Sequence, residues 1–274
     1  MRDKCNLLTA PINKLCVLSV FAANDLEKVM LKSLLHSLLN FIFPPFCASC
    51  HKKILEPKGG LICDACWDSL ERWEAQSCQR CGALLPEQSG PDLPLLCPKC
   101  RIPDWACADI RVIGPFKQPL SDAIHLLKYS DRRSVVKKLS LYLEQSLAGA
   151  GQYQAADLIL SVPLHSARKR ERGYNQAQLL AQALGKTLNK PCPENIISRA
   201  RHTQTQTKLN KQQRLENVKD IFTVKKPELV KGKTVILIDD VLTTGATIGS
   251  CARKLLEAGA SKVLALTAAA APLE

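Results

Sequence analysis

A pair of acidic residues followed by a short run of small and hydroxyl-bearing residues is the part of this sequence best suited to bind a phosphate. Asp239 and Asp240 follow the apolar run 235–238, and a helical pattern begins at Ala246. Backbone N–H groups at the start of a helix attract anions, and the helix dipole adds to this attraction. Gly245 lets the backbone turn and approach a ligand closely. The predicted phosphate-binding residues are Val241, Leu242, Thr243, Thr244, Gly245, Ala246 and Thr247.

The two carboxylates would repel a phosphate that they faced, so we expect them to bind a neighbouring part of the ligand. At the end of a strand, Asp239 and Asp240 can accept hydrogen bonds from two sugar hydroxyls, and carboxylates can approach Mg²⁺ through water. An acidic pair can also simply cap a helix. The apolar strand, the two acids and the Thr-Thr-Gly-x-Thr run together form a more specific pattern. The segment therefore predicts a site for a phosphorylated sugar.

Eight of the 13 cysteines fall into four Cys-x-x-Cys pairs, which is the spacing of zinc ribbons. Two such pairs supply four thiolates to one tetrahedral ion, and a site of four cysteines has no open position for a substrate. We therefore expect two structural Zn²⁺ ions, bound by sequential rather than interleaved sets, in a reducing cytoplasm. The expected ligands are Cys47, Cys50, Cys63 and Cys66 for one ion, and Cys78, Cys81, Cys97 and Cys100 for the other.

The positive charge of the chain is confined to its C-terminal part. Residues 1–109 hold 12 basic and 12 acidic residues, whereas residues 110–274 hold 26 basic and 13 acidic residues. This excess indicates an anionic partner, either a phosphorylated ligand or nucleic acid, although a merely soluble basic surface is the alternative. Hydrophobic residues make up 46% of the chain, enough for a buried core, which excludes global disorder.

Alternating strand and helix patterns would hold the acidic pair at the end of a buried strand. Strands are predicted at 157–163, 233–238 and 262–267, and helices at 175–188 and 246–258. Strand, helix and strand in this order give parallel βαβ units. The predicted fold class is therefore α/β, a parallel sheet flanked by helices over residues 110–274. A small N-terminal double zinc-ribbon module at 47–100 and a linker at 101–109 precede it.

The N-terminal residues carry no predicted chemistry. We interpret residues 1–29 as an extension upstream of a start at Met30, and their apolar run 15–23 is too short to span a bilayer. Residues 30–46 form a predicted amphipathic helix with leucines on one face. Its polar face carries little charge, which favours packing on its own domain over stable membrane insertion.

The acidic pair and the threonine-rich run resemble the phosphoribosyl pyrophosphate (PRPP) loop of type I phosphoribosyltransferases. Two further stretches, 161–165 and 172–176, resemble the VPLH and RGYNQ signatures of the ComF family (competence protein F, also called GntX-like). Members of this family join an N-terminal double zinc ribbon to a type I phosphoribosyltransferase-like domain. The resemblance covers about residues 30–270.

This resemblance implies that the ligand is PRPP or ribose 5-phosphate, with Mg²⁺ accompanying PRPP. It implies a pyrophosphate loop at Val162, Pro163, Leu164 and His165. For His165, helix capping is an equal alternative to ligand contact. Lys128 and Tyr129 could contact the substrate, or they could simply form an exposed helix end. A basic stretch with Arg199, Thr203, Gln206 and Arg214 resembles a flexible catalytic loop, although it could be a solvated charge run. The implied catalytic residues are Asp239, Asp240, Arg168, Arg172 and Lys208.

An active transferase would displace pyrophosphate at the anomeric carbon of the ribose, with arginine and Mg²⁺ stabilising the leaving group. Nothing in the sequence identifies the nucleophile, and no amidohydrolase domain supports the use of glutamine, so turnover itself is undecided. The resemblance also implies a role in natural competence, with single-stranded DNA and a helicase-like protein as partners. Aromatic residues are only 5% of the chain, which predicts few base-stacking platforms and weak, salt-sensitive DNA contact. A third interpretation makes the zinc ribbons a docking module for a protein partner.

Overall fold

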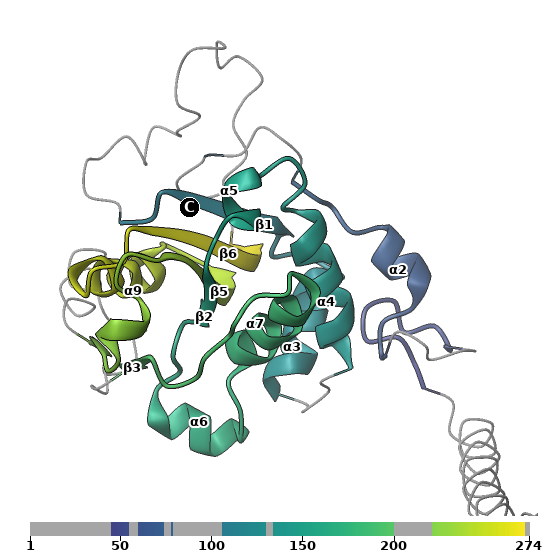
Figure 1. Ribbon diagram of the computed structural model, residues 1–274. Helices are drawn as coiled ribbons and strands as arrows, with labels where there is room; N and C mark the ends of the chain where they lie inside the picture. The colour runs from purple at the N-terminus through teal and green to yellow at the C-terminus, as the bar shows by residue number, and fades with distance from the viewer. Residues whose placement is uncertain are drawn as a thin grey trace, which may run out of the picture.

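A parallel β-sheet forms the centre of the molecule (Figure 1). The computed structural model describes residues 45–54, 60–73, 78, 106–129, 134–199 and 221–271. Within these ranges the sheet has the strand order β1-β6-β5-β2, and each neighbouring pair is parallel. The strands are β1 (Asp109–Pro115), β2 (Leu158–Ser161), β5 (Thr234–Leu242) and β6 (Lys262–Ala270). The predicted α/β fold class is confirmed.

Helices cover both faces of this sheet, which is why its central strands are apolar on both sides. On one face lie α3 (Leu120–Tyr129), α4 (Val135–Gln145) and α7 (Gln176–Thr187), and on the other lies α9 (Ala246–Glu257) (Figure 1). Ile236 and Ile238 of β5 pack with the first group, whereas Val235 and Leu237 pack toward α9. The shorter helices are α5 (Gly151–Gln154), α6 (Ser166–Arg172) and the 3₁₀ turn η3 (Pro227–Leu229). No helix among the described residues is long and apolar enough to cross a bilayer.

The structure contains each predicted strand and helix of this domain but corrects three strand ends. The strand predicted to end at residue 163 stops at Ser161, and the strand predicted to end at residue 267 continues to Ala270. The sequence places the end of β5 at Ile238, whereas β5 continues to Leu242. Asp239 pairs with Thr267 of β6, and Val241 pairs with Ala269. The prediction that both acids follow the strand is therefore wrong, because hydrogen bonds to a distant strand extend it.

A small antiparallel hairpin lies beside the main sheet. It consists of β3 (Ile197–Arg199) and β4 (Phe222–Val224). The residues between these strands belong to the predicted flexible loop. Its members Thr203, Gln206, Lys208 and Arg214 lie outside the described residues, as do residues 1–44 with the predicted extension and most of the predicted amphipathic helix.

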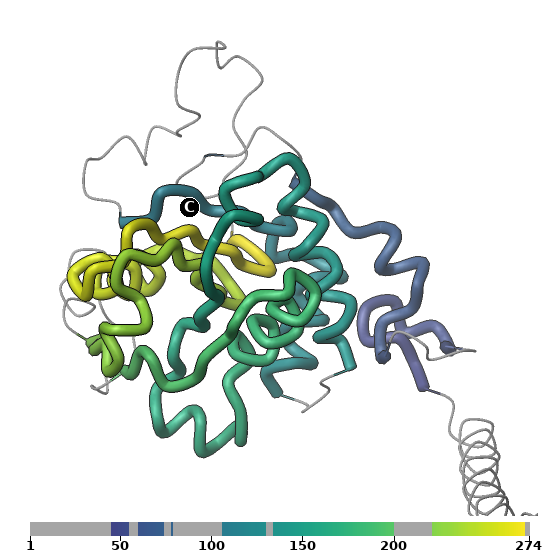
Figure 2. Tube along the Cα trace, viewed as in Figure 1, coloured from purple at the N-terminus to yellow at the C-terminus, as the bar shows by residue number. Residues whose placement is uncertain are grey.

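The cysteine-rich segment packs directly on the α/β domain (Figure 2). It includes the short helix α2 (Asp64–Asp68), in which the side chain of Trp67 is fully buried. The Trp67 ring lies 5.6 Å from the ring of Tyr142 on α4, and the Tyr142 hydroxyl donates a hydrogen bond of 3.2 Å to the Trp67 carbonyl. The backbone N–H of Trp73 donates to the backbone carbonyl of Ile113 on β1. The segment therefore shares one hydrophobic core with α3, α4 and α7.

Gly114 on β1 is expected to be required for this packing. A Cβ atom at this position would lie 2.1 Å from the carbonyl oxygen of Glu71, so Gly114→Ala must push two backbones apart. We expect the free energy of unfolding to fall by about 1–3 kcal/mol, measured by urea denaturation. Gly151→Ala is the matched control, because nothing lies within 4 Å of the added methyl group. Equal stability of the two variants would contradict the described contact.

Candidate phosphate site and cysteine cluster

The turn between β5 and α9 has the geometry of an anion site. Gly245 is the N-cap of α9 and has φ 76°, a left-handed conformation that favours glycine. The first N–H groups of an α-helix have no carbonyl partner within the helix, so those following Gly245 are available to an anion. Thr243 and Thr244 are exposed beside them, and the Thr244 hydroxyl also accepts from the N–H of Ala246 at 3.4 Å. Backbone amides and hydroxyls thus gather at one helix start.

The two adjacent acids face different surroundings, because successive residues of a strand point to opposite faces of the sheet. The carboxylate of Asp240 lies 3.0 Å from the Nζ atom of Lys128 at the end of α3. Asp239 points the other way, toward the hairpin and α9, where it interacts electrostatically with Arg199. The N–H of Asp240 donates to Oδ1 of Asp239 at 2.9 Å. The two carboxylates are therefore adjacent, but Asp240 faces α3 and Asp239 faces the hairpin and α9.

Burial and the neighbouring Asp240 raise the pKa of Asp239 to about 8, although Lys128 and Arg199 lower it in part. Burial and the charge of Arg168 lower the pKa of Arg199, and Asp239 opposes this shift. Arg199 on β3, a predicted site residue, is thus near Asp239 and also near Arg168 on α6. The surroundings of Asp239 therefore favour its protonated form more than those of an exposed carboxyl would.

The predicted pyrophosphate loop lies beside this cluster at the same edge of the sheet. The N–H of Val162 donates to the carbonyl of Ile238, and its own carbonyl accepts from Nδ2 of Asn175. Pro163 has no N–H. His165 is the N-cap of α6, and its Nδ1 accepts from the N–H of Ala167 at 3.1 Å. The N–H of Val162 and the Nδ1 atom of His165 therefore already have partners within the protein.

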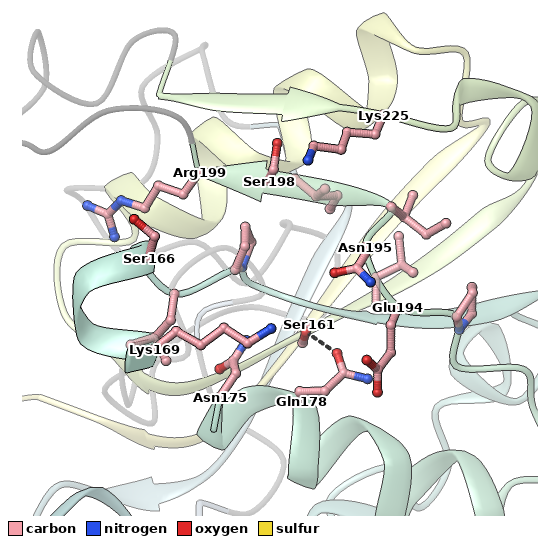
Figure 3. A pocket seen from close by; sticks show the side chains of 16 residues that line it. Ser161, Ser166, Lys169, Asn175, Gln178, Glu194, Asn195, Ser198, Arg199 and Lys225 are labelled. Atoms are coloured by element: carbon pink, nitrogen blue, oxygen red, sulfur yellow. Dashed lines mark hydrogen bonds between the residues drawn. The ribbon is translucent and has the colours of Figure 1, made fainter. Parts of the chain in front are cut away.

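A polar pocket of about 290 Å³ opens between this loop, α7 and the hairpin. Figure 3 shows Lys169 and Asn175 on one wall, with Ser198 and Lys225 on the other. Ser161 lies on its floor and donates a 2.6 Å hydrogen bond to Gln178. Three cations among the lining residues, Lys169, Arg199 and Lys225, outnumber the one acid, Glu194, so the pocket suits an anionic group.

The structure separates the two arginines that the sequence places together. Arg168 lies on the exposed surface of α6 near Arg199, whereas the guanidinium of Arg172 lies over the Tyr129 ring, 5.1 Å from its centroid. Sequence reasoning missed Lys169 and Lys225 as pocket residues. Lys169 belongs to a basic run that could have indicated it, whereas no local pattern marks Lys225.

The sulfur atoms of Cys47, Cys50, Cys63 and Cys66 lie within 4.8 Å of one another. The Cys47–Cys66 and Cys50–Cys63 sulfur distances are 3.8 and 3.7 Å. Four sulfurs at the usual Zn–S distance of about 2.3 Å form a tetrahedron with edges of about 3.8 Å, so the cluster fits Zn²⁺. This grouping is the sequential one. In the predicted second set Cys78 is buried, and Cys81, Cys97 and Cys100 lie outside the described residues.

The backbone helps to ionise one of these thiols. Although burial opposes ionisation, N–H groups of Cys50 and Cys63 donate to the Cys47 sulfur at 3.5 and 3.4 Å, and its pKa falls to about 6. Burial and the surrounding cysteines instead raise the pKa of Cys66 to about 12. Four thiolates cannot ionise together without a cation, so metal binding must release protons here.

Comparison with known proteins accounts for both halves of the chain. Residues 38–101 match the double zinc ribbon domain, and residues 170–272 match the phosphoribosyl transferase domain. DNA utilization protein YhgH of Escherichia coli (strain K12) is 33% identical over 225 residues, which are 80% of this chain and 94% of that protein. Competence protein F of Haemophilus influenzae is 31% identical over 222 residues, 79% of this chain and 86% of that protein. Competence protein ComFC of Bacillus subtilis is 39% identical over 102 residues, 37% of this chain and 39% of that protein. The chain belongs to the ComF family, in which a double zinc ribbon precedes a phosphoribosyltransferase domain.

Proposed function

We propose that this protein binds PRPP or ribose 5-phosphate at the turn between β5 and α9, and that it acts in competence or DNA utilization. The observation that carries the proposal is the start of α9, where a left-handed Gly245 precedes the first helix N–H groups and the two acids lie near the end of the preceding strand. The terminal phosphate of the ligand would accept hydrogen bonds from the backbone of 243–247. We also propose a cytoplasmic location, because a reducing compartment keeps zinc-binding thiols from forming disulfides.

The surrounding residues have separable roles in this proposal. Asp239 and Asp240 would orient the ribose hydroxyls, and Lys128 would hold Asp240 in place until the sugar arrives. Arg168 and Arg199, with the pocket cations Lys169 and Lys225, would attract the pyrophosphate end of PRPP.

The acidic pair also provides the donor set that Mg²⁺ prefers, because carboxylates and water are its usual ligands. Asp239 and Asp240 would hold the ion, which would neutralise charge on a departing pyrophosphate.

Thermal unfolding in the presence of PRPP and Mg²⁺ tests the proposal. At a hundredfold excess over Kd, a specific ligand stabilises the fold by about 2.7 kcal/mol, or roughly 5–10 °C for a domain of this size. The combined change Asp239→Asn with Asp240→Asn is expected to abolish this shift. Glu144→Gln with Glu228→Gln removes the same charge from other surfaces and should retain it. Absence of a shift in the wild-type protein would defeat the phosphoribosyl assignment.

A second function, contact with single-stranded DNA, is favoured by the basic surface of α6. The helix carries Arg168, Lys169, Arg170 and Arg172 against one acid, Glu171. The names of the Escherichia coli and Haemophilus influenzae relatives, DNA utilization protein and competence protein, agree with this role. Single-stranded DNA and a helicase-like competence protein are the partners it implies. Oligonucleotide affinity that survives the change of both acids to Asn would separate this function from sugar-phosphate binding.

A further inference from the structure

Three aromatic side chains and one guanidinium form a row on the surface of the α/β domain. The ring of Phe116, just after β1, lies 5.9 Å from the ring of His125 on α3. The His125 ring lies 5.7 Å from the ring of Tyr129, one helical turn later. Arg172, at the end of α6, covers the Tyr129 ring at 5.1 Å. We name this row the stacking row; its spacing is that of stacked or tilted π-systems.

The stacking row is open to solvent where a protein would normally bury its aromatic rings. Tyr129 is 70% exposed, the highest value among the large apolar and aromatic residues that the structure describes as exposed. His125 is also exposed, and Phe116 is half-buried at the other end. An exposed ring whose neighbours are rings and a guanidinium offers a further flat partner a site on which to stack.

Positive charge surrounds the end of this row. Arg172 belongs to α6, whose seven residues include four basic side chains and one acidic one. The Tyr174 hydroxyl donates to the carbonyl of Leu127, which fixes the segment after α6 against the end of α3. The rings and the basic helix therefore keep their relative positions, and they present planar faces beside phosphate-binding cations.

We propose that the stacking row binds the bases of single-stranded DNA while the basic residues of α6 contact its phosphates. Duplex DNA keeps its bases stacked inside, so an exposed ring face favours the single-stranded form. The low content of Phe, Trp and Tyr predicted few stacking platforms, but folding brings two of these residues, Phe116 and Tyr129, into one row with His125. The inference rests on the proposed role with DNA and is independent of sugar-phosphate binding at the turn after β5.

Fluorescence anisotropy with a labelled oligothymidylate tests the row. Tyr129→Ala is expected to weaken binding about five- to hundredfold, the effect of losing one stacked base. Tyr129→Phe keeps the ring and should bind as the wild type does. Leu229→Ala, which trims another exposed apolar residue, should change nothing. Arg170→Ala should weaken binding, because it removes a phosphate contact. It should also reduce the slope of log affinity against log salt concentration by about 1.

An oligonucleotide of the same length with abasic residues identifies the partner of the ring. The wild type should bind this probe at least as weakly as the Tyr129→Ala variant binds oligothymidylate, and the variant should distinguish the two probes less than the wild type does. Wild-type affinity that is equal for both probes, or unaffected by Tyr129→Ala, would overturn the inference, and so would failure of the wild type to bind oligothymidylate at low salt. A PRPP thermal shift that persists in any of these cases shows that the phosphate site stands without the stacking row.

Discussion

Chelation of zinc from the intact chain is expected to lower the melting temperature of the phosphoribosyltransferase domain itself, by roughly 6–20 °C. The first cysteine cluster holds the backbone around Trp67, and the buried Trp67 side chain packs on Tyr142 of α4. Loss of the ion would release this tryptophan from the shared core, and loss of a large aromatic contact costs about 3–5 kcal/mol. Calorimetry of the chelated and zinc-loaded protein measures the difference.

Single cysteine variants make this result specific to the cluster. Cys63→Ser removes one of four ligands and should reproduce the effect of chelation. Cys192→Ser is the matched control, because Cys192 is half-buried beside Gln178 and outside the cluster. An unchanged melting temperature in protein shown to be free of zinc would mean that the ribbon does not support the domain. It would also revive the interpretation of the ribbons as an independent docking module.

Gly245→Val is expected to weaken binding of ribose 5-phosphate about thirtyfold or more. A side chain at φ 76° costs about 1–2 kcal/mol, more when it is β-branched, so the turn would leave the conformation that exposes the helix N–H groups. Isothermal titration with ribose 5-phosphate measures the change in Kd.

Gly232→Val separates backbone strain from loss of the site. Gly232 has φ 71° and nothing within 4 Å of an added Cβ, so its substitution imposes similar strain far from the turn. We expect this control to lose stability but to keep its affinity for ribose 5-phosphate. Equal loss of affinity in both variants would mean that general destabilisation, and not the turn, controls binding.

Local patterns in the sequence predicted the fold well because the signals of its central elements are strong. The apolar run at 235–238 and the acidic pair after it marked β5, and the turn residues marked the start of α9. The length of β5 could not be predicted in the same way, since Val241 and Leu242 are held by pairing with Ala269 and Ala270 of β6.

The parts of the site that depend on distant contacts were not visible in the sequence. The sequence predicted a pyrophosphate contact for Arg172 but not its position over the ring of Tyr129, a residue from another helix. Lys225 lines the pocket only because β4 returns beside β3. The packing of Trp67 on Tyr142 joins residues 75 positions apart. Each of these contacts joins residues that are far apart in the sequence, so no local sequence pattern predicts it.

A crystal structure with ribose 5-phosphate bound would show where the phosphate lies. We expect the phosphate on the backbone amides of 243–247, with the ribose hydroxyls directed to Asp239 and Asp240. An empty turn, with the sugar phosphate held instead between Lys169 and Lys225 in the neighbouring pocket, would contradict this expectation.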